Sequence, residues 1–209
     1  LVKARAKPKG RDLLSKSRAI NILSAARLFL FGARDVWFVV ALPVYLSTVF
    51  GWDFWMVGGF LAAWVIGYGI VQSFAPRITG KQRGQVPDGR AAFVWAALLA
   101  GLPALIALGL AAGWSAQLVL LGGLLLFGAL FAVNSSLHSY LIVSYAKEDG
   151  VSLDVGFYYM SNALGRLIGT LLSGWLYQQY GLATCLWWSS LFVLLAALCS
   201  LGLPRRAGD

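Results

Sequence analysis

Four charged residues lie inside long apolar segments of this sequence, where charges are costly. They are Arg27, Arg34, Asp35 and Arg166. A charged side chain at the centre of a lipid bilayer costs about 2.5–3.5 kcal/mol on insertion scales, so such residues face a protein interior or an aqueous cavity. Arginine stays charged and binds phosphate-like groups through a planar fork of donors. We therefore interpret the three arginines as candidates for a pocket that binds a multiply charged oxyanion.

The spacing of these residues predicts a shared depth. Arg27 and Arg34 are seven positions apart, which places them on nearly one face of a helix and about 10 Å apart along its axis. Arg166 lies about ten residues into its own apolar segment. It should therefore reach the depth of Arg34 near the midplane, where transporter substrate sites lie. Asn162 precedes Arg166 by four positions and shares its helix face.

Other polar residues of the fourth and fifth apolar segments are candidates for the same cavity: Asn134, Ser135, Ser136, His138, Tyr158, Tyr159 and Asn162. Histidine ordinarily titrates between pH 5 and 8, so His138 is a candidate for proton coupling, with Asp35 as the second. A histidine that only packs and forms hydrogen bonds explains His138 equally well. For the arginines, the structural alternative is an ion pair between Arg34 and Asp35, with Arg27 extending to the membrane surface.

The sequence offers little for other chemistry. Cys185 and Cys199 are the only cysteines and would lie about 21 Å apart along a helix, so they cannot bind one ion together. The sequence has no loop of the type that cradles nucleotide phosphates. We therefore expect no enzymatic activity, no cofactor and no metal site. The net charge of +9 does not predict nucleic-acid binding, because the basic residues flank apolar segments.

The elements that carry these residues are predicted to cross a membrane. Hydrophobic residues make up 59% of the 209 residues and charged residues 12%, whereas soluble domains carry about 25% charged residues. The apolar segments of roughly 20 residues are long enough to cross a hydrocarbon layer of about 30 Å. Aromatic residues at segment ends suit the headgroup region: Trp52, Trp55, Trp114, Tyr177 and Tyr180. We predict an all-α membrane protein.

The pattern predicts six helices, near residues 24–49, 55–76, 91–112, 116–143, 156–177 and 183–203. The 14 cations outside these helices occur only on alternate connections: 1–20, 77–90, 144–155 and 204–209. The other connections carry no lysine or arginine: 50–54, 113–115 and 178–182. Cytosolic loops carry such an excess of lysine and arginine. We therefore predict six spans in a bacterial inner membrane, with both ends in the cytosol.

The predicted organisation has three parts. A basic cytosolic linker covers residues 1–20, a six-helix bundle covers 21–204, and a cytosolic tail covers 205–209. The first residue is Leu1 rather than methionine, which suggests that a segment upstream is missing.

Small residues recur at four-residue intervals in the fifth and fourth predicted helices: Gly165, Gly169 and Ser173, and Gly128, Ala132 and Ser136. Such rows let helix backbones approach closely in lipid, where no hydrophobic drive brings helices together. Pro43 and Pro103 are expected to bend their own helices. The sequence therefore allows close packing along the fourth and fifth helices, although ordinary contacts explain most of these small residues, and it allows bends in the two helices that hold Pro43 and Pro103.

Several strings resemble known membrane transporters. A basic lead-in, six helices and a longer basic loop after the second helix resemble the C-terminal half of the major facilitator superfamily. Residues 79–84 (Thr-Gly-Lys-Gln-Arg-Gly) resemble its Gly-rich basic loop motif but lack the Asp-Arg core, and residues 162–181 are similar to its eleventh helix. Three segments resemble the organoarsenical efflux permeases of that superfamily. They are residues 15–21 (Ser-Lys-Ser-Arg-Ala-Ile-Asn), 25–40 (Ala-Ala-Arg-Leu-Phe-Leu-Phe-Gly-Ala-Arg-Asp-Val-Trp-Phe-Val-Val) and 58–69 (Gly-Gly-Phe-Leu-Ala-Ala-Trp-Val-Ile-Gly-Tyr-Gly).

This resemblance implies a transporter completed by an N-terminal six-helix half, with residues 1–20 as the central loop. It implies export of 1-arseno-3-phosphoglycerate, which a partner glyceraldehyde-3-phosphate dehydrogenase makes from arsenate, and hence arsenate resistance. Two oxyanion ends suit two or more arginines, whereas a carrier of trivalent arsenite would be expected to offer clustered thiols. Sugar phosphates and other organic anions fit the arginines equally well. A self-contained six-helix channel or membrane scaffold is the alternative of a different class.

Overall fold

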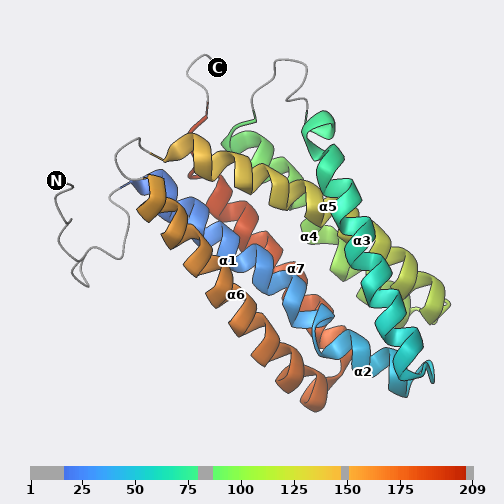
Figure 1. Cartoon of the computed structure of the whole chain (residues 1–209). Coiled ribbons are helices and arrows are strands. Elements are labelled where there is room, and N and C mark those ends of the chain that lie inside the picture. Colours follow the sequence, from blue (N-terminus) through green and yellow to red (C-terminus); the bar gives the residue numbers. More distant parts are fainter. Residues whose placement is uncertain (1–16, 80–86, 147–150, 206–209) are drawn as a thin grey trace, which may run out of the picture.

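The computed structural model describes residues 17–79, 87–146 and 151–205, and these residues form seven helices and no strand (Figure 1). The helices are α1 (Arg18–Phe38), α2 (Ala41–Thr48), α3 (Phe54–Ile78), α4 (Gly89–Ala111), α5 (Ala116–Tyr145), α6 (Val151–Tyr180) and α7 (Leu182–Ser200). The predicted all-α class is confirmed for this part of the chain.

Most of these helices are long and apolar enough to cross a membrane. α1 and α2 together form one span of 31 residues, Arg18–Thr48, and α3, α4, α5 and α7 form four more. α6, with 30 residues, is also long enough, but polar residues such as Asn162 and Arg166 lower its hydropathy. The chain is therefore a multi-pass helical membrane protein, and its least apolar span is the one that carries Arg166.

The two ends of the bundle differ in charge. Among the described residues, Arg18, Arg77, Arg90 and Arg205 lie near the end of the bundle where α1 begins and α7 finishes (Figure 1). We call this the basic end. The connections at the opposite end are short and uncharged apart from Asp53, whose Oδ1 accepts a hydrogen bond of 2.8 Å from Met56 N–H and caps α3. The remaining predicted loop cations lie outside the described residues.

Aromatic side chains mark the opposite end. Trp55, Trp114 and Tyr180 are largely exposed there, with relative exposures of 82%, 67% and 64%. Exposed amphipathic rings at span ends are expected at the headgroup region. Trp52 and Tyr177 instead pack against the apolar core, so the predicted aromatic belt is formed by only part of the expected set.

The packing order places α1 between α6 and α7. α1 makes its most extensive contacts with α6 and α7, while α4 packs against α7 and α5, and α3 packs against α5. Figure 1 shows α1 running beside α6 along most of its length, with α3 on the far side of the bundle. The helix that carries Arg27, Arg34 and Asp35 is therefore packed on two sides by other helices.

The close approach of α1 and α6 depends on glycine. A Cβ atom at Gly165 would collide with the carbonyl oxygen of Leu28, and one at Gly169 would lie 2.7 Å from the carbonyl oxygen of Gly32. Only hydrogen fits at both positions, and the row of small residues in α6 allows this close approach. The tight contact holds the middle of α1 against the middle of α6, where the charged residues lie.

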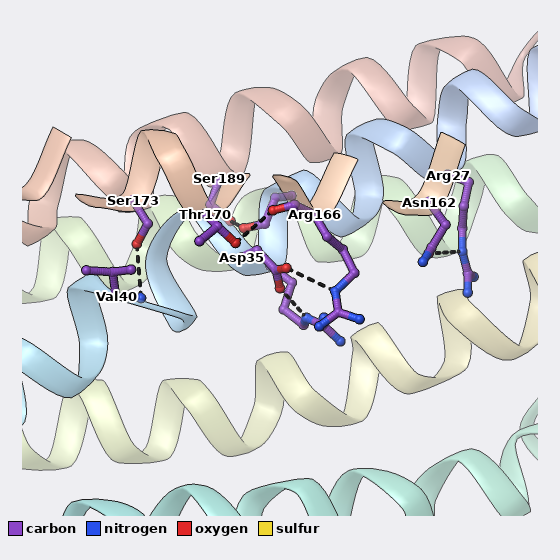
Figure 2. A network of polar contacts seen from close by, with 10 residues as sticks. Arg27, Asp35, Val40, Asn162, Arg166, Thr170, Ser173 and Ser189 are labelled. Carbon is purple, nitrogen blue, oxygen red and sulfur yellow. Dashed lines mark hydrogen bonds and ion pairs between the residues drawn. The ribbon is translucent and has the colours of Figure 1, made fainter. Parts of the chain in front are cut away.

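The first predicted helix is broken between Phe38 and Ala41, where the sequence predicted one helix over 24–49. Pro43 lacks the N–H that would bond to the carbonyl of residue 39, so the helix cannot continue regularly there. Ser173 Oγ of α6 accepts hydrogen bonds from the N–H groups of Val40 (3.3 Å) and Ala41 (3.0 Å) (Figure 2). A neighbouring hydroxyl thus satisfies backbone donors that the break leaves without helical partners.

The helix boundaries correct the predicted ones by a few residues. α1 begins at Arg18, inside the predicted linker at 1–20 and before the predicted helix start at 24. α6 begins at Val151 rather than at 156, and α7 ends at Ser200, before residue 203. The apolar pattern missed the starts of α1 and α6 because charged and polar residues occur there, and a helix can extend beyond the apolar layer that the pattern detects. Residues 1–16 and 206–209, which hold most of the predicted linker and tail, lie outside the described residues.

Candidate anion-binding site

Two arginines from two helices share one carboxylate at mid-span. Nε of Arg34 on α1 lies 2.8 Å from Asp35 Oδ1, and Nε of Arg166 on α6 lies 3.2 Å from Asp35 Oδ2 (Figure 2). The Asp35 side chain is only 1% exposed. Each carboxylate oxygen therefore carries one charge-assisted hydrogen bond, and the three side chains form a single ionic unit.

The positions of Arg34 and Arg166 along their helices set the depth of this ionic unit in the bundle. Arg34 follows the middle residue of the span Arg18–Thr48, and Arg166 lies at the middle of α6. Gly169 lets the helices approach so closely that a Cβ atom there would come within 3.0 Å of Asp35 Cβ. The predicted common depth of Arg34 and Arg166 is therefore found in the structure, because Asp35 can reach both guanidinium groups.

Arg27 forms a second polar unit between α1, α5 and α6. Its Nε donates to Asn162 Oδ1 at 2.9 Å, and its Nη1 donates to the carbonyl oxygen and the hydroxyl of Ser135, both at 3.3 Å. The guanidinium also lies over the rings of Phe31 and Tyr158, with its carbon 3.9 and 5.1 Å from their centroids. Neutral groups and aromatic faces thus surround this cation.

The aromatic ring of Phe31 connects the two units. Phe31 follows Arg27 by four positions and precedes Arg34 by three, so all three side chains share one face of α1. The guanidinium carbon of Arg34 lies 4.9 Å from the Phe31 centroid and 5.4 Å from that of Phe131 on α5. Figure 2 shows Arg27, Asn162 and Arg166 along one side of this helix pair.

The three guanidinium groups differ in exposure. The side chain of Arg34 is 14% exposed and that of Arg166 is 54% exposed, while Arg27 is buried. Among the described residues, the terminal nitrogens of Arg34 and Arg166 donate no hydrogen bond, because their contacts with Asp35 use Nε. Both guanidinium groups therefore keep the paired donors that bind an oxyanion in a fork.

Positive charge exceeds negative charge in the middle of the bundle. This region holds three cations, Arg27, Arg34 and Arg166, and one described carboxylate, Asp35. The other described acids lie at or near helix ends: Asp53, Asp88 and Asp154. Asp88 Oδ1 accepts from the N–H groups of Arg90 (3.0 Å) and Ala91 (3.2 Å), so it caps α4. An anion bound at mid-span would compensate an excess of two positive charges.

The other predicted site residues divide between the two units and the packing of α5. Asn162 and Tyr158 contact Arg27. Asn134 instead donates to the carbonyl oxygens of Trp95 on α4 (3.0 Å) and Leu130 (2.9 Å), so its amide group joins α5 to α4. His138 is buried, and its Nδ1 has no hydrogen-bond partner in the described part of the chain.

Of the two structural alternatives for the arginines, the structure contains one and not the other. The ion pair between Arg34 and Asp35 is present, and Arg166 extends it to a second helix. Arg27 does not extend to the membrane surface, because its guanidinium is held inside the bundle by Asn162 and Ser135. The aromatic partners Phe31 and Phe131 were missed by the sequence analysis, although the helical spacing of Phe31 from both arginines was a usable signal.

A hydroxyl-rich cavity of about 470 Å³ lies between α3 and α5 near the basic end. Its polar lining includes Thr79, Ser136, Ser139 and Tyr140. Ser139 donates to the carbonyl oxygen of Ser135 at 3.0 Å, the same oxygen that accepts from Arg27. Neither Arg34 nor Arg166 lines this cavity. The mid-span unit reaches the surface of the bundle through Arg166, whose side chain is 54% exposed.

No protein-family model matches this chain, and no curated protein matches it. The fold and the site define a class only: a multi-pass helical membrane protein with a cationic cluster at mid-span.

Proposed function

We propose that this chain is the C-terminal six-helix half of a major-facilitator-type transporter that exports an organic oxyanion. One observation carries the proposal: Arg34 and Arg166 meet at mid-span from different helices and keep their terminal donors free. Binding sites of secondary transporters lie near the midplane, between two structural halves. Transport by alternating access requires no covalent step, so we assign no enzymatic activity.

The exposure of Arg166 supports a second half. A side chain that is 54% exposed at the middle of a span would face lipid, at a cost of about 2.5–3.5 kcal/mol for a charge at the bilayer centre. An N-terminal six-helix bundle over this face would remove that cost and enclose the site. The two halves would then rock about Arg34 and Arg166 and expose them to each side of the membrane in turn.

The substrate that we propose is an ester of pentavalent arsenic with two oxyanion ends, with 1-arseno-3-phosphoglycerate as the first candidate. Planar guanidinium groups bind phosphate and arsenate oxygens through paired hydrogen bonds. The mid-span excess of two positive charges over the carboxylate of Asp35 favours an anion that carries at least two negative charges. The link to a glyceraldehyde-3-phosphate dehydrogenase, which would make this ester from arsenate, belongs to the same proposal.

The orientation in the membrane is also a proposal. The basic end, with Arg18, Arg77, Arg90 and Arg205, would face the cytosol of a bacterium, because lysine and arginine are enriched in cytosolic loops. The hydroxyl-rich cavity between α3 and α5 would then open toward the cytosolic side, from which an exported anion arrives.

The test is arsenate resistance in a sensitive bacterium that carries the full-length gene, with and without the dehydrogenase. Resistance that requires both genes supports export of an arsenylated ester. Resistance from the transporter gene alone supports export of free arsenate, and no resistance in either strain contradicts the arsenical substrate. The fragment 1–209 in liposomes provides the control: anion flux through this fragment alone would support the alternative of a self-contained channel.

A further inference from the structure

Arg27 is a buried cation that no carboxylate of the described residues contacts. It is 5% exposed, and its hydrogen bonds go to the amide oxygen of Asn162 and to the carbonyl and hydroxyl oxygens of Ser135. A charge taken out of water is costly unless it is paired. The neutral acceptors orient the guanidinium but do not neutralise it, so its full positive charge is available to an anion.

The position of Arg27 relative to Arg34 is fixed by Phe31. The two guanidinium carbons lie 3.9 and 4.9 Å from the centroid of the Phe31 ring, so at most about 9 Å separates them. Arg27 lies toward the basic end and Arg34 lies at mid-span on the same helix. A single small molecule that extends along α1 can reach both charges.

We propose that Arg27 is a second anion subsite, so that the site selects molecules with two anionic groups joined by a short spacer. Arg34 and Arg166 bind one anionic group, Arg27 binds the other, and Phe31 sets the distance between them. This inference rests on the proposed function, because it assigns a substrate class to the same site. Asn162 and Ser135 are positioning residues, since they hold the guanidinium of Arg27 in place from α6 and α5.

Two features distinguish this subsite from a structural arginine. A structural buried arginine is normally paired with a carboxylate, but Asp35, the one carboxylate at mid-span among the described residues, is already shared by Arg34 and Arg166. In addition, Arg27 lies where the Ser135 carbonyl also accepts from Ser139, whose side chain lines the cavity near the basic end. Arg27 does not itself line this cavity, but it is the one of the three arginines that lies nearest to the basic end.

The experiment measures binding to the purified full-length transporter by calorimetry with two probes. One is trimethylene bisphosphonate, which carries two phosphonates three carbons apart, and the other is propylphosphonate, which carries one. The wild-type protein should bind the bisphosphonate at least about tenfold more tightly, since a hydrogen bond to a charged group is worth that factor or more. Arg27→Gln should remove this preference while changing propylphosphonate binding less than about threefold.

Two further variants and a bisphosphonate with a longer spacer complete the test. Arg77→Gln removes an exposed cation at the basic end and should leave both affinities unchanged, while Arg34→Gln should weaken both probes. In the wild-type protein, dodecamethylene bisphosphonate should bind more weakly than the trimethylene compound, because its long flexible chain must fold back to bring the second group beside Arg27 and loses conformational entropy. This measurement also tests the subsite if Arg27→Gln fails to fold.

The outcomes separate the subsite from the proposed function. Equal weakening of both probes by Arg27→Gln, or no preference of the wild-type protein for the short bisphosphonate, overturns the second subsite. In either case, propylphosphonate binding that depends on Arg34 leaves the proposed transporter site intact. If the wild-type protein binds neither probe, the anion site at Arg34 and Arg166 fails, and the subsite fails with it.

Discussion

Asp35 is placed to compete with a bound anion, because its two oxygens accept hydrogen bonds from the Nε atoms of Arg34 and Arg166. A substrate oxyanion would need the same guanidinium groups, either through their terminal nitrogens or by displacing the carboxylate. In the proposed transporter, the carboxylate would therefore lower the affinity of the site and at the same time favour release. A transporter needs both effects, since a site that binds too tightly turns over slowly.

Asp35→Asn should lower the half-saturating substrate concentration of transport by about tenfold, since one charged competitor of the anion is removed. The maximal rate should fall as well, because the carboxylate no longer replaces the departing substrate. Transport kinetics in proteoliposomes would measure both values. Asp53→Asn is the matched control, since its side chain caps α3 away from the site and asparagine also caps helices. Unchanged kinetics in Asp35→Asn would show that the carboxylate has a structural role only.

At the scale of the helices, the contact between α1 and α6 fixes the site. Gly165→Ala should destabilise the bundle by about 1–3 kcal/mol, the usual cost of overpacking, because the new methyl group would collide with the Leu28 carbonyl. Gly156→Ala on the same helix meets nothing within 4 Å and should be neutral or slightly stabilising. Thermal unfolding in detergent measures the difference. Equal unfolding temperatures for the two variants would contradict the proposed close packing at Gly165.

The break between α1 and α2 gives a second prediction at this scale. Ser173→Ala removes the acceptor of two backbone N–H groups, those of Val40 and Ala41. An unsatisfied buried donor costs about 1–3 kcal/mol, so the unfolding temperature should fall. Thr170→Ala serves as the control, because the Thr170 hydroxyl bonds only to the carbonyl of Arg166 in its own helix (2.8 Å). A similar loss in both variants would contradict a specific role for Ser173.

Some features of the helices could be predicted from the sequence, whereas contacts between distant residues could not. The approximate bounds of the long helices follow from apolar segment length, but the first predicted helix is two helices, α1 and α2. Gly165 and Gly169, part of the small-residue row noted in the sequence, lie at the close contact between α1 and α6. The partner of Ser173 could not be predicted, because Val40 is more than a hundred positions away and the contact depends on the break near Pro43. Proline predicts an irregular helix but not the residue that satisfies the freed donors.

In the candidate site, too, some residues could be predicted from the sequence while some of their contacts could not. Arg27, Arg34 and Arg166 were singled out because charges are rare inside apolar segments, and the structure brings all three to one region of α1 and α6. Asn134 was assigned to the same cavity, yet its amide bonds to α4, whereas its neighbour Ser135 contacts Arg27. Adjacent helical residues point about 100° apart, and the sequence alone does not tell how α5 is rotated about its axis.

At the scale of the whole molecule, the charge difference between the two ends predicts the orientation in the membrane. With both native cysteines replaced, Trp114→Cys should react with a membrane-impermeant maleimide in intact cells, because it is 67% exposed at the uncharged end. Arg205→Cys, at the basic end, should react only after the cells are permeabilised. The reverse pattern of labelling would contradict the proposed orientation and with it the direction of export.

The exposure of Arg166 at mid-span is the whole-molecule feature that the proposed function explains best. α1 and α6 present Arg34 and Arg166 on a face where half of the Arg166 side chain is exposed. A second bundle over this face would enclose the anion between two halves, and rocking of the halves would move the opening of the site from one side of the membrane to the other.

The measurement that tests this site most directly is uptake of arsenic into everted membrane vesicles that contain the full-length transporter. The vesicles receive radiolabelled arsenate together with the dehydrogenase, its nicotinamide cofactor and glyceraldehyde 3-phosphate. We predict uptake that requires the dehydrogenase and that falls by at least about tenfold in Arg34→Gln and Arg166→Gln, with normal amounts of each variant in the membrane. Uptake in both variants at the wild-type rate would contradict an anion site at these two arginines.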